Sequence, residues 1–299
     1  MATTTAAKRF THSQFAVAMA FLVPSFIGFF GFFAWPTVRG IYLSFTEYDM
    51  LRDPEWVGFE NYLKMFQDPI FLNSIWVTLE YVFLNIGIQT VLALLIAVLL
   101  HRFTRSIVIR GIILLPYLIA NVIVALVWYW LADYNLGLIN SVLDGLGLSR
   151  MGFFGNEYLA MPTIALVNVW RHVGYTALLI FAGLVAIPRD VYEAAEVDGA
   201  GEWRIFRSVT LPLLRPVLAF VLVITLVGSF QIYDTIAVTT EGGPVHATRA
   251  INVYIFQQAF EQRNFGYASA LAVILMIFLA FIAIAQNKLL KANENDLDR

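Results

Sequence analysis

Four polar side chains share one face of a predicted membrane helix over residues 162–187. Their spacing of i, i+3, i+4 and i+7 is that of one side of an α-helix, and they are Asn168, Arg171, His172 and Tyr175. Arg171 lies about 14 Å along the helix axis from its start, close to the middle of the apolar segment. Ionisable groups inside hydrocarbon usually face a cavity or a partner. The face therefore predicts either a polar path or a set of interhelical hydrogen bonds.

Polar residues recur in two more apolar segments. Gly228, Gln231, Asp234 and Thr235 share a face of a predicted helix over 217–238, and a segment over 107–131 adds further polar groups. Amide groups both donate and accept hydrogen bonds, which suits sugar hydroxyls, and aromatic rings can lie against apolar sugar faces. The predicted substrate-path residues are Tyr117, Asn121, Asn168, Trp170, Arg171, Tyr175, Ser229, Gln231, Tyr233 and Asp234.

Other polar groups favour a structural interpretation. A weaker stripe in the second apolar segment holds Thr78, Tyr81, Asn85 and Gln89, with Glu80 beside it. Amide and hydroxyl side chains often bond to one another across membrane helices, so this stripe predicts interhelical contacts. Arg171 and Asp234 have a second interpretation as well, because an ion pair between them would lower the free-energy cost of burying each charge.

Several kinds of enzyme chemistry are missing from the chain. No glycine precedes a lysine anywhere, so the phosphate-binding loop of P-loop ATPases is absent. The four histidines are scattered over separate segments, and there are no cysteines. These absences exclude a paired-histidine metal helix, a thiolate metal site and thiol catalysis. We therefore expect no catalytic residues, no metal site and no enzyme activity.

The composition is that of a membrane protein. Of the 299 residues, 60% are hydrophobic and 13% are charged, and the mean hydropathy is +0.73. Soluble domains contain about 25% charged residues. The net charge of −2 gives no electrostatic basis for binding nucleic acid. Six stretches are long enough to cross about 30 Å of hydrocarbon as helices, which predicts an all-α integral membrane protein. They are Phe15–Trp35, Ile75–Leu100, Ile107–Leu131, Pro162–Ile187, Val217–Val238 and Ala268–Gln286.

The lysines and arginines predict the orientation of these six helices. With a cytoplasmic N-terminus, the inner segments hold twelve basic residues and the outer segments hold six. Because basic residues gather on the cytoplasmic side, both termini are predicted to be cytoplasmic. The first apolar run is too long for a secretory signal, so we expect it to be retained. The predicted organisation is a tail over 1–14, a membrane domain over 15–286 with a cytoplasmic loop at 188–216, and a tail over 287–299.

The predicted loop at 188–216 is long for a helix–helix connection. Asp190 and Glu193 have the spacing of an N-cap and capping box, and Gly199 stands where a left-handed residue would end the helix. A second helical piece follows, which Pro212 and Pro216 are expected to break. The loop is either an amphipathic linker on the bilayer surface or a docking element for a partner.

The residues of this loop resemble a known motif. Glu193-Ala194-Ala195, then Asp198-Gly199-Ala200, with Phe206 and Leu211-Pro212 downstream, resemble the EAA loop of ABC-importer permease subunits. The resemblance implies a coupling helix that sits in a cleft of a separate ATPase subunit. ATP and magnesium would be bound by that ATPase, and no cofactor by this chain. The residues that would contact the ATPase are Glu193, Ala194, Ala195, Asp198, Gly199, Ala200 and Phe206.

Further motifs resemble the carbohydrate-uptake branch of these permeases. They are Leu115-Pro116-Tyr117, Asn168-Val169-Trp170-Arg171, Phe230-Gln231-Ile232-Tyr233-Asp234, Glu241-Gly242-Gly243-Pro244 with Thr248, and Phe265-Gly266-Tyr267-Ala268. Glu241-Gly-Gly-Pro departs from a more usual glycine run at the tip of a loop. The resemblance implies the MetI-like permease fold in a bacterial or archaeal plasma membrane. It also implies a second permease subunit in a heterodimer, two ATPase subunits and an extracytoplasmic solute-binding protein.

The sequence also leaves other cargoes and other classes of protein to compare. Arg171 would also suit an anionic cargo such as a glycerol phosphate ester, and a polyol is a further possible cargo. A stand-alone secondary transporter is a different class, although six spans are few and no matched broken helices are evident. An intramembrane enzyme would need a nucleophile and a base within reach, and the sequence offers no such pair.

Overall fold

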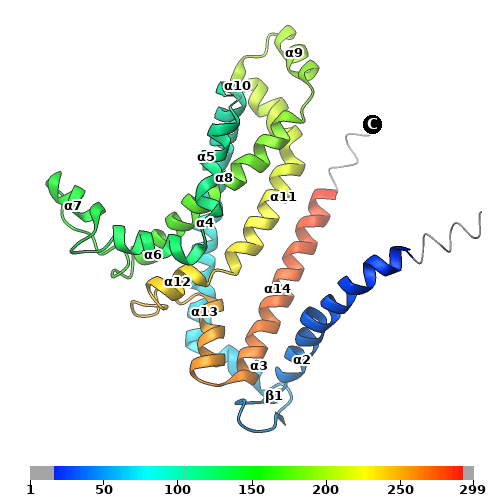
Figure 1. Cartoon of the computed structure of the whole chain (residues 1–299), viewed down its shortest axis with the longest axis vertical. Coiled ribbons are helices and arrows are strands. Elements are labelled where there is room, and N and C mark those ends of the chain that lie inside the picture. Colours follow the sequence, from blue (N-terminus) through cyan, green and yellow to red (C-terminus); the bar gives the residue numbers. More distant parts are fainter. Residues whose placement is uncertain (1–16, 105, 292–299) are drawn as a thin grey trace, which may run out of the picture. The chain divides into compact units, whose positions relative to one another are not determined.

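A computed structural model describes residues 17–104 and 106–291 (Figure 1). The predicted tail over 1–14, and residues 292–299 of the predicted C-terminal tail, lie outside the described residues. The described chain divides into two compact units. One comprises the N-terminal part up to Met65 together with Gln258–Ile274, and the other comprises Phe66–Gln257 together with the residues from Leu275 onward.

The prediction of six apolar segments is confirmed within the described residues, with one correction. Five helices are long and apolar enough to cross a membrane, and they are Val17–Leu43, Pro69–Phe103, Ala160–Val185, Glu202–Thr239 and Phe265–Gln286. The sixth segment is α5 (Ile107–Leu118) followed by α6 (Asn121–Leu131), and these two helices meet at 88° (Figure 1). The predicted segment over Ile107–Leu131 is therefore two helices joined by a bend, and not a single helix.

The first unit contains the apolar helix that begins the described chain and a small loop structure. The helix continues through η1 (Phe30–Ala34), a π-helical turn, and α2 (Trp35–Leu43). Strand β1 (Thr46–Glu47) then pairs antiparallel with β2 (Glu55–Trp56). The amide nitrogen of Asn61, in α3 (Glu60–Gln67), donates to the carbonyls of Ser44 and Thr46, at 3.0 and 2.9 Å, and holds the strand end.

Helix α4 (Pro69–Phe103) and helix α8 (Ala160–Val185) form the central pair of the second unit. Asp68 starts α4 as its N-cap, because its carboxylate accepts from the backbone N–H groups of Ile70 and Phe71. Helices α5 and α11 (Leu211–Phe230) also pack against α8. The remaining elements are α7 (Leu138–Gly145), α9 (Arg189–Val197), α10 (Glu202–Ile205), η2 (Phe206–Thr210), α12 (Asp234–Thr239), α13 (Ile251–Phe256), η3 (Gln257–Glu261) and α14 (Phe265–Lys291).

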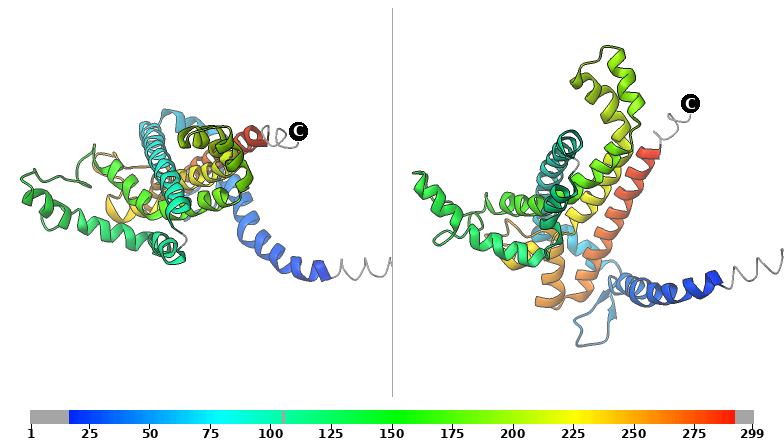
Figure 2. Two further views of the ribbon diagram at one scale, coloured as in Figure 1. Left: turned by 90° about the horizontal axis from the view of Figure 1, so that it is seen from above. Right: turned by 45° about the horizontal axis from the view of Figure 1, so that its top comes forward.

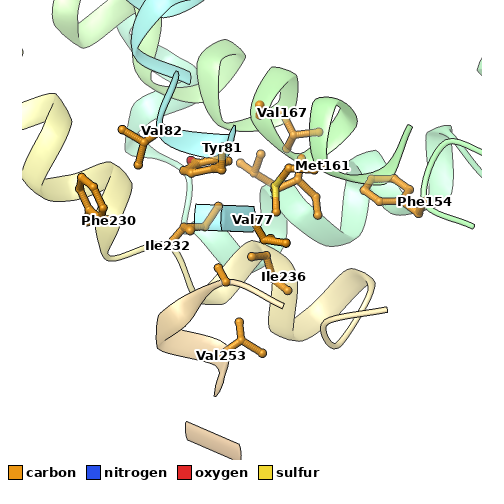
Figure 3. Close-up of a cluster of buried hydrophobic side chains, with 14 of the residues drawn as sticks. Val77, Tyr81, Val82, Phe154, Met161, Val167, Phe230, Ile232, Ile236 and Val253 are labelled. Carbon is orange, nitrogen blue, oxygen red and sulfur yellow. The ribbon is translucent and has the colours of Figure 1, made fainter. Parts of the chain in front are cut away.

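A buried apolar cluster joins α4, α8, α12 and α13 in this unit (Figure 3). Val77 and Tyr81 of α4 and Met161 of α8 lie with Ile236 of α12 and Val253 of α13. Ile236 and Met161 are almost completely buried, at 0% and 1% exposed. The cluster fixes the short helix α12 against the long pair.

One glycine allows an unusually close helix contact. A Cβ atom on Gly174 of α8 would collide with the backbone oxygen of Ile113 in α5. Gly111, also in α5, has open space around it. Small residues commonly let membrane helices approach each other closely. Gly174 therefore sets the distance between α5 and α8.

The fifth apolar segment differs from the prediction in two places. It is interrupted at Gln231–Tyr233, because α11 ends at Phe230 and α12 begins at Asp234. The predicted face from Gly228 to Thr235 is therefore not one continuous helical face, although Gly228, Gln231 and Asp234 line the same cavity. At the other end, Pro212 and Pro216 do not break the helix. Pro212 lies in the first turn of α11, and the preceding π-helical turn η2 carries the chain into it without an interruption.

Candidate substrate cavity and coupling loop

A cavity of about 320 Å³ lies within the second unit, between α4, α5, α8 and α11. Of the predicted substrate-path residues, all but Trp170 line it. Six further polar residues that line it were not in the predicted substrate-path set, and they are Tyr81, Asn85, Gln89, His172, Thr176 and Thr225. His172 already belongs to the predicted polar face of this helix, and Thr176 extends that face by one turn, so periodicity could have identified Thr176 as well.

Trp170 lies outside the cavity. Its ring packs edge-on against Trp128 of α6, with ring centroids 5.6 Å apart, and its side chain is 42% exposed. Trp170 is two residues after Asn168, and two residues turn an α-helix by about 200°. The two side chains therefore point to opposite sides of α8.

Asn168 lines the cavity and links α8 to α12. Its amide nitrogen donates to Thr235 Oγ1 at 3.1 Å and to the carbonyl of Ile164 at 3.0 Å. Asn168 is 5% exposed and Thr235 is fully buried. This contact holds the first turn of α12 in place beyond the interruption in the fifth segment.

Arg171 binds the backbone where α5 ends. Its Nε donates to the carbonyl of Ile119 at 3.1 Å, and Nη2 donates to the carbonyl of Tyr117 at 3.2 Å. Its Nη1 lies 2.8 Å from His172 Nε2, and His172 Nδ1 lies 2.9 Å from the carbonyl of Asn168. The pair of contacts fits a neutral imidazole whose Nδ1–H donates to Asn168 and whose Nε2 accepts from Arg171.

The aromatic residues of the cavity largely cover one another. The rings of Tyr117 and Tyr175 are stacked, with centroids 4.4 Å apart and planes 10° apart. The guanidinium carbon of Arg171 lies 5.3 Å from the Tyr117 ring centre. Tyr233 packs against Phe256 at 4.9 Å. Each ring of the stacked pair thus covers one face of the other.

Asp234 is the acidic group of the cavity. Its carboxylate accepts a hydrogen bond from the amide nitrogen of Asn121 at 3.4 Å. Among the described residues, none of the ion pairs joins Asp234 to Arg171, so the predicted pairing between them does not form. The cavity therefore holds one basic and one acidic group that bind different neighbours.

The polar stripe of α4 makes interhelical hydrogen bonds, as its interpretation expected. The amide nitrogen of Asn85 donates to Ser229 Oγ at 2.9 Å, and that of Gln89 donates to Thr176 Oγ1 at 2.7 Å. Both amides also line the cavity. The stripe thus both ties α4 to α8 and α11 and supplies polar wall.

None of the residues of helix α9 in the long loop is buried, and hydrogen bonds define its C-terminal end. Figure 2 shows the ribbon of this part of the chain from two further directions. The N–H of Ala200 donates to the carbonyl of Ala195, and that of Gly199 donates to the carbonyl of Glu196, both at 3.0 Å. Gly199 has φ +75°, so the predicted left-handed C′ residue is confirmed. The predicted N-cap was wrong: Pro188 caps the helix, which places Asp190 in the first turn, and Glu193 pairs with Arg189 at 3.3 Å.

Phe206 differs from the other predicted coupling residues. It stacks on Trp203 with centroids 5.8 Å apart and lines a second cavity, of about 670 Å³, beside the Phe103 end of α4. In this region Arg102 pairs with Glu202 at 3.0 Å. No residue of α9 is buried, so its surface is open to a partner.

Apolar helices around a polar cavity, with an exposed capped helix on a long loop, define the class of protein as a membrane transport protein. Residues 89–293 match the family described as the binding-protein-dependent transport system inner membrane component. The chain belongs to this family and is a multi-pass membrane permease.

Two relatives show the branch of the family. The chain is 34% identical to the trehalose/maltose transport system permease protein MalF of Thermococcus litoralis, over 84% of this chain and 86% of that protein. It is also 34% identical to the sn-glycerol-3-phosphate transport system permease protein UgpA of Yersinia pestis, over 85% and 87%. The prediction of a carbohydrate-uptake permease is confirmed by these matches and the family.

A solved structure shows the same fold. A chain of a bacterial ABC transporter involved in the import of the acidic polysaccharide alginate superposes with a TM-score of 0.82 at 24% identity. The match covers 95% of this chain and 98% of that one. The predicted MetI-like helical membrane fold is thereby confirmed, with the short strand pair β1–β2 as its one addition among the described residues.

Proposed function

We propose that this chain is the permease subunit of an ATP-driven importer and that a saccharide passes through the cavity between α4, α5, α8 and α11. The observation that carries the proposal is the clustering of amide, hydroxyl and aromatic groups from four separate chain segments around one cavity. Such groups match the hydroxyls and apolar faces of a sugar. The printed cargo of the Thermococcus relative, trehalose or maltose, supports a di- or oligosaccharide.

The energy source in this proposal is a separate ATPase that docks on α9. The exposure of α9 and its firm C-terminal motif support this role, because a docking helix must present a surface and keep its shape. Two ATPase subunits bind ATP and magnesium, and this chain binds no cofactor. A second permease subunit forms a heterodimer with it, and an extracytoplasmic binding protein delivers the cargo. Both termini lie on the cytoplasmic side of a bacterial or archaeal plasma membrane.

The transport cycle follows from this arrangement. Closure of the ATPase pair carries α9 with it, and the membrane helices rock until the cavity opens to the outside. The binding protein then releases its cargo into the cavity, and hydrolysis of ATP returns the helices to the inward-open state. Only three residues separate the end of α8 from the start of α9, so α8 is the most direct connection between the docking surface and the cavity.

A glycerol phosphate ester is the second candidate cargo. Arg171 in the cavity wall and the printed cargo of the Yersinia relative favour it. Against it, three of the five N–H donors of Arg171 already bind this chain, and Asp234 places a negative charge in the same cavity.

Uptake into proteoliposomes tests the proposal. The chain is co-purified with its ATPase, partner permease and binding protein, and radiolabelled maltose, trehalose and glycerol 3-phosphate are offered with and without ATP. We expect ATP-dependent uptake of a saccharide. Uptake driven by an ion gradient in the isolated chain would contradict the proposal and favour a secondary transporter. ATP-dependent uptake of glycerol 3-phosphate alone would assign the second cargo.

A further inference from the structure

The bend between α5 and α6 leaves backbone carbonyls without helical partners. The last carbonyls of any α-helix lack an intrahelical N–H donor. At the end of α5 the chain turns by 88° within two residues, Ile119 and Ala120, before α6 starts. Inside a membrane, carbonyls of this kind need donors from protein or from water in a cavity.

Arg171 supplies two of those donors from the neighbouring helix. Its Nε and Nη2 groups bond to the carbonyls of Ile119 and Tyr117, which are separated by one residue at the corner of the bend. A guanidinium has donors in a fixed planar fork, so one side chain can hold two acceptors at a defined separation. A lysine has a single ammonium and lacks this geometry.

The same guanidinium also fixes an aromatic wall of the cavity. It lies over the ring of Tyr117, which also stacks on Tyr175 and meets the His172 ring edge-on. Tyr175 belongs to α8, one turn beyond Arg171. Arg171 thus binds both the backbone and the ring of Tyr117, and it joins the corner of the bend to α8.

We infer that Arg171 is a positioning residue that holds the α5–α6 bend and the Tyr117 ring in the geometry that receives the cargo. Its charge serves the backbone carbonyls of this chain and does not serve as the ligand of an anionic cargo. The inference rests on the proposed function where it names a cargo. The contacts of Arg171 with the carbonyls of Tyr117 and Ile119, which we call the clamp, are a property of the chain itself.

Spin-label distances test the clamp independently of transport. The natural chain has no cysteines, so Val108→Cys in α5 and Val127→Cys in α6 can be labelled as a defined pair. Both positions are exposed, at 65% and 51%. A straight helix would place their Cα atoms about 28 Å apart, and the bend brings them closer. Double electron–electron resonance of the assembled transporter is measured with Arg171, Arg171→Gln and Arg171→Lys.

A matched control comes from a second arginine between the same two helices. Arg110 of α5 lies with its guanidinium carbon 4.4 Å from the ring centre of Phe181 in α8, away from the bend. Arg110→Gln removes the same charge and keeps the bend contacts. It is expected to leave the distance distribution between the two labels unchanged.

We expect both Arg171 variants to broaden the distribution and shift it to longer distances. In uptake assays we expect the KM for the cargo to rise about tenfold, with a smaller change in the maximal rate, because the cavity wall is disordered while the coupling loop is intact. If Arg171→Gln leaves the distances unchanged, the clamp is wrong. It is also wrong if Arg171→Lys restores the uptake of an anionic cargo to the natural level, since charge alone would then suffice.

The proposed function and the clamp formed by Arg171 are contradicted by different results. A natural transporter that takes up no saccharide overturns the proposed function, whatever the spin labels report. A natural transporter that imports saccharide and shows the same distances in all three forms at position 171 overturns only the clamp. Because Arg171→Lys keeps the charge of the site, it provides the measurement if Arg171→Gln does not assemble.

Discussion

Asn168 and Thr235 are joined by a hydrogen bond of 3.1 Å, which links the middle of α8 to the first turn of α12. Thr235 lies just after the interruption in the fifth apolar segment, and the bond attaches this part of the segment to α8, which lines the cavity. It shows how a short helix with only six residues is held in position within a membrane protein.

Thr235→Val removes this bond and keeps the shape of the side chain. We expect a loss of about 0.5–2 kcal/mol in the free energy of unfolding, the range of hydrogen bonds between membrane helices. Thermal unfolding of the purified assembly measures it. Thr239→Val is the control, because the hydroxyl of Thr239 donates only to the carbonyl of Thr235 within the same helix. Equal losses in the two variants would show that the link to Asn168 has no special role.

Tyr175 lines the cavity and Trp170 lies outside it, although both belong to α8. Substituting each one tests whether the cavity is the substrate path. Tyr175→Ala opens one wall of the cavity, so we expect a rise in KM for uptake of about tenfold or more. Trp170 packs on Trp128 outside the cavity, and Trp170→Ala is expected to leave KM within about twofold while lowering stability. A larger effect on KM from Trp170 than from Tyr175 would contradict the assignment of the cavity as the substrate path.

Two substitutions of Gly199 test the coupling loop, because aspartate and asparagine have nearly the same shape and differ in charge. A Cβ at this position meets open space, and the left-handed backbone is tolerated by Asn and Asp better than by other residues. We expect Gly199→Asp to abolish ATP-driven uptake, because it puts a charge on the docking surface while membrane insertion is unaffected. Gly199→Asn is expected to retain part of the activity. Normal uptake by the aspartate variant would remove α9 from the coupling mechanism.

Gly174 tests the close approach of α5 and α8. Gly174→Ala forces a Cβ against the backbone oxygen of Ile113, so we expect a destabilisation of about 1–3 kcal/mol or a shift of α5. Gly111→Ala is the control in α5, where the added methyl group has open space and alanine favours the helix. If thermal unfolding finds the two variants equally stable, the helices can separate at little cost.

The sequence predicted the apolar segments well because each must satisfy its backbone internally, and length and hydropathy reveal this directly. The sequence also predicted the polar face of α8, because the spacing of residues on one side of a helix is regular. The bend after Leu118 was missed although Pro116 stands nearby as a helix breaker. Pro116 marks a place where the helix can deform, but the size of the bend also depends on the contact with Arg171, which is distant in the sequence.

The interruption at Gln231–Tyr233 had a weaker signal. No proline or glycine lies within these three residues, so helical spacing continued through them. The break is set by tertiary contacts of Asn168, Thr235 and the buried Ile236, which are distant in the sequence. Trp170 is a different case, because the period of the helix already places it opposite Asn168.

The most direct test of the central claim is protection of a single cysteine in the cavity. Gly228 lines the cavity and has space for a side chain, and the chain has no other thiol. In the assembled transporter, held in the state that binds cargo, we expect the transported saccharide to slow the labelling of Gly228→Cys severalfold. Leu166→Cys, on the exposed side of α8, should be labelled at the same rate with and without the saccharide. A saccharide that is imported but leaves the labelling of Gly228→Cys unchanged would contradict the account.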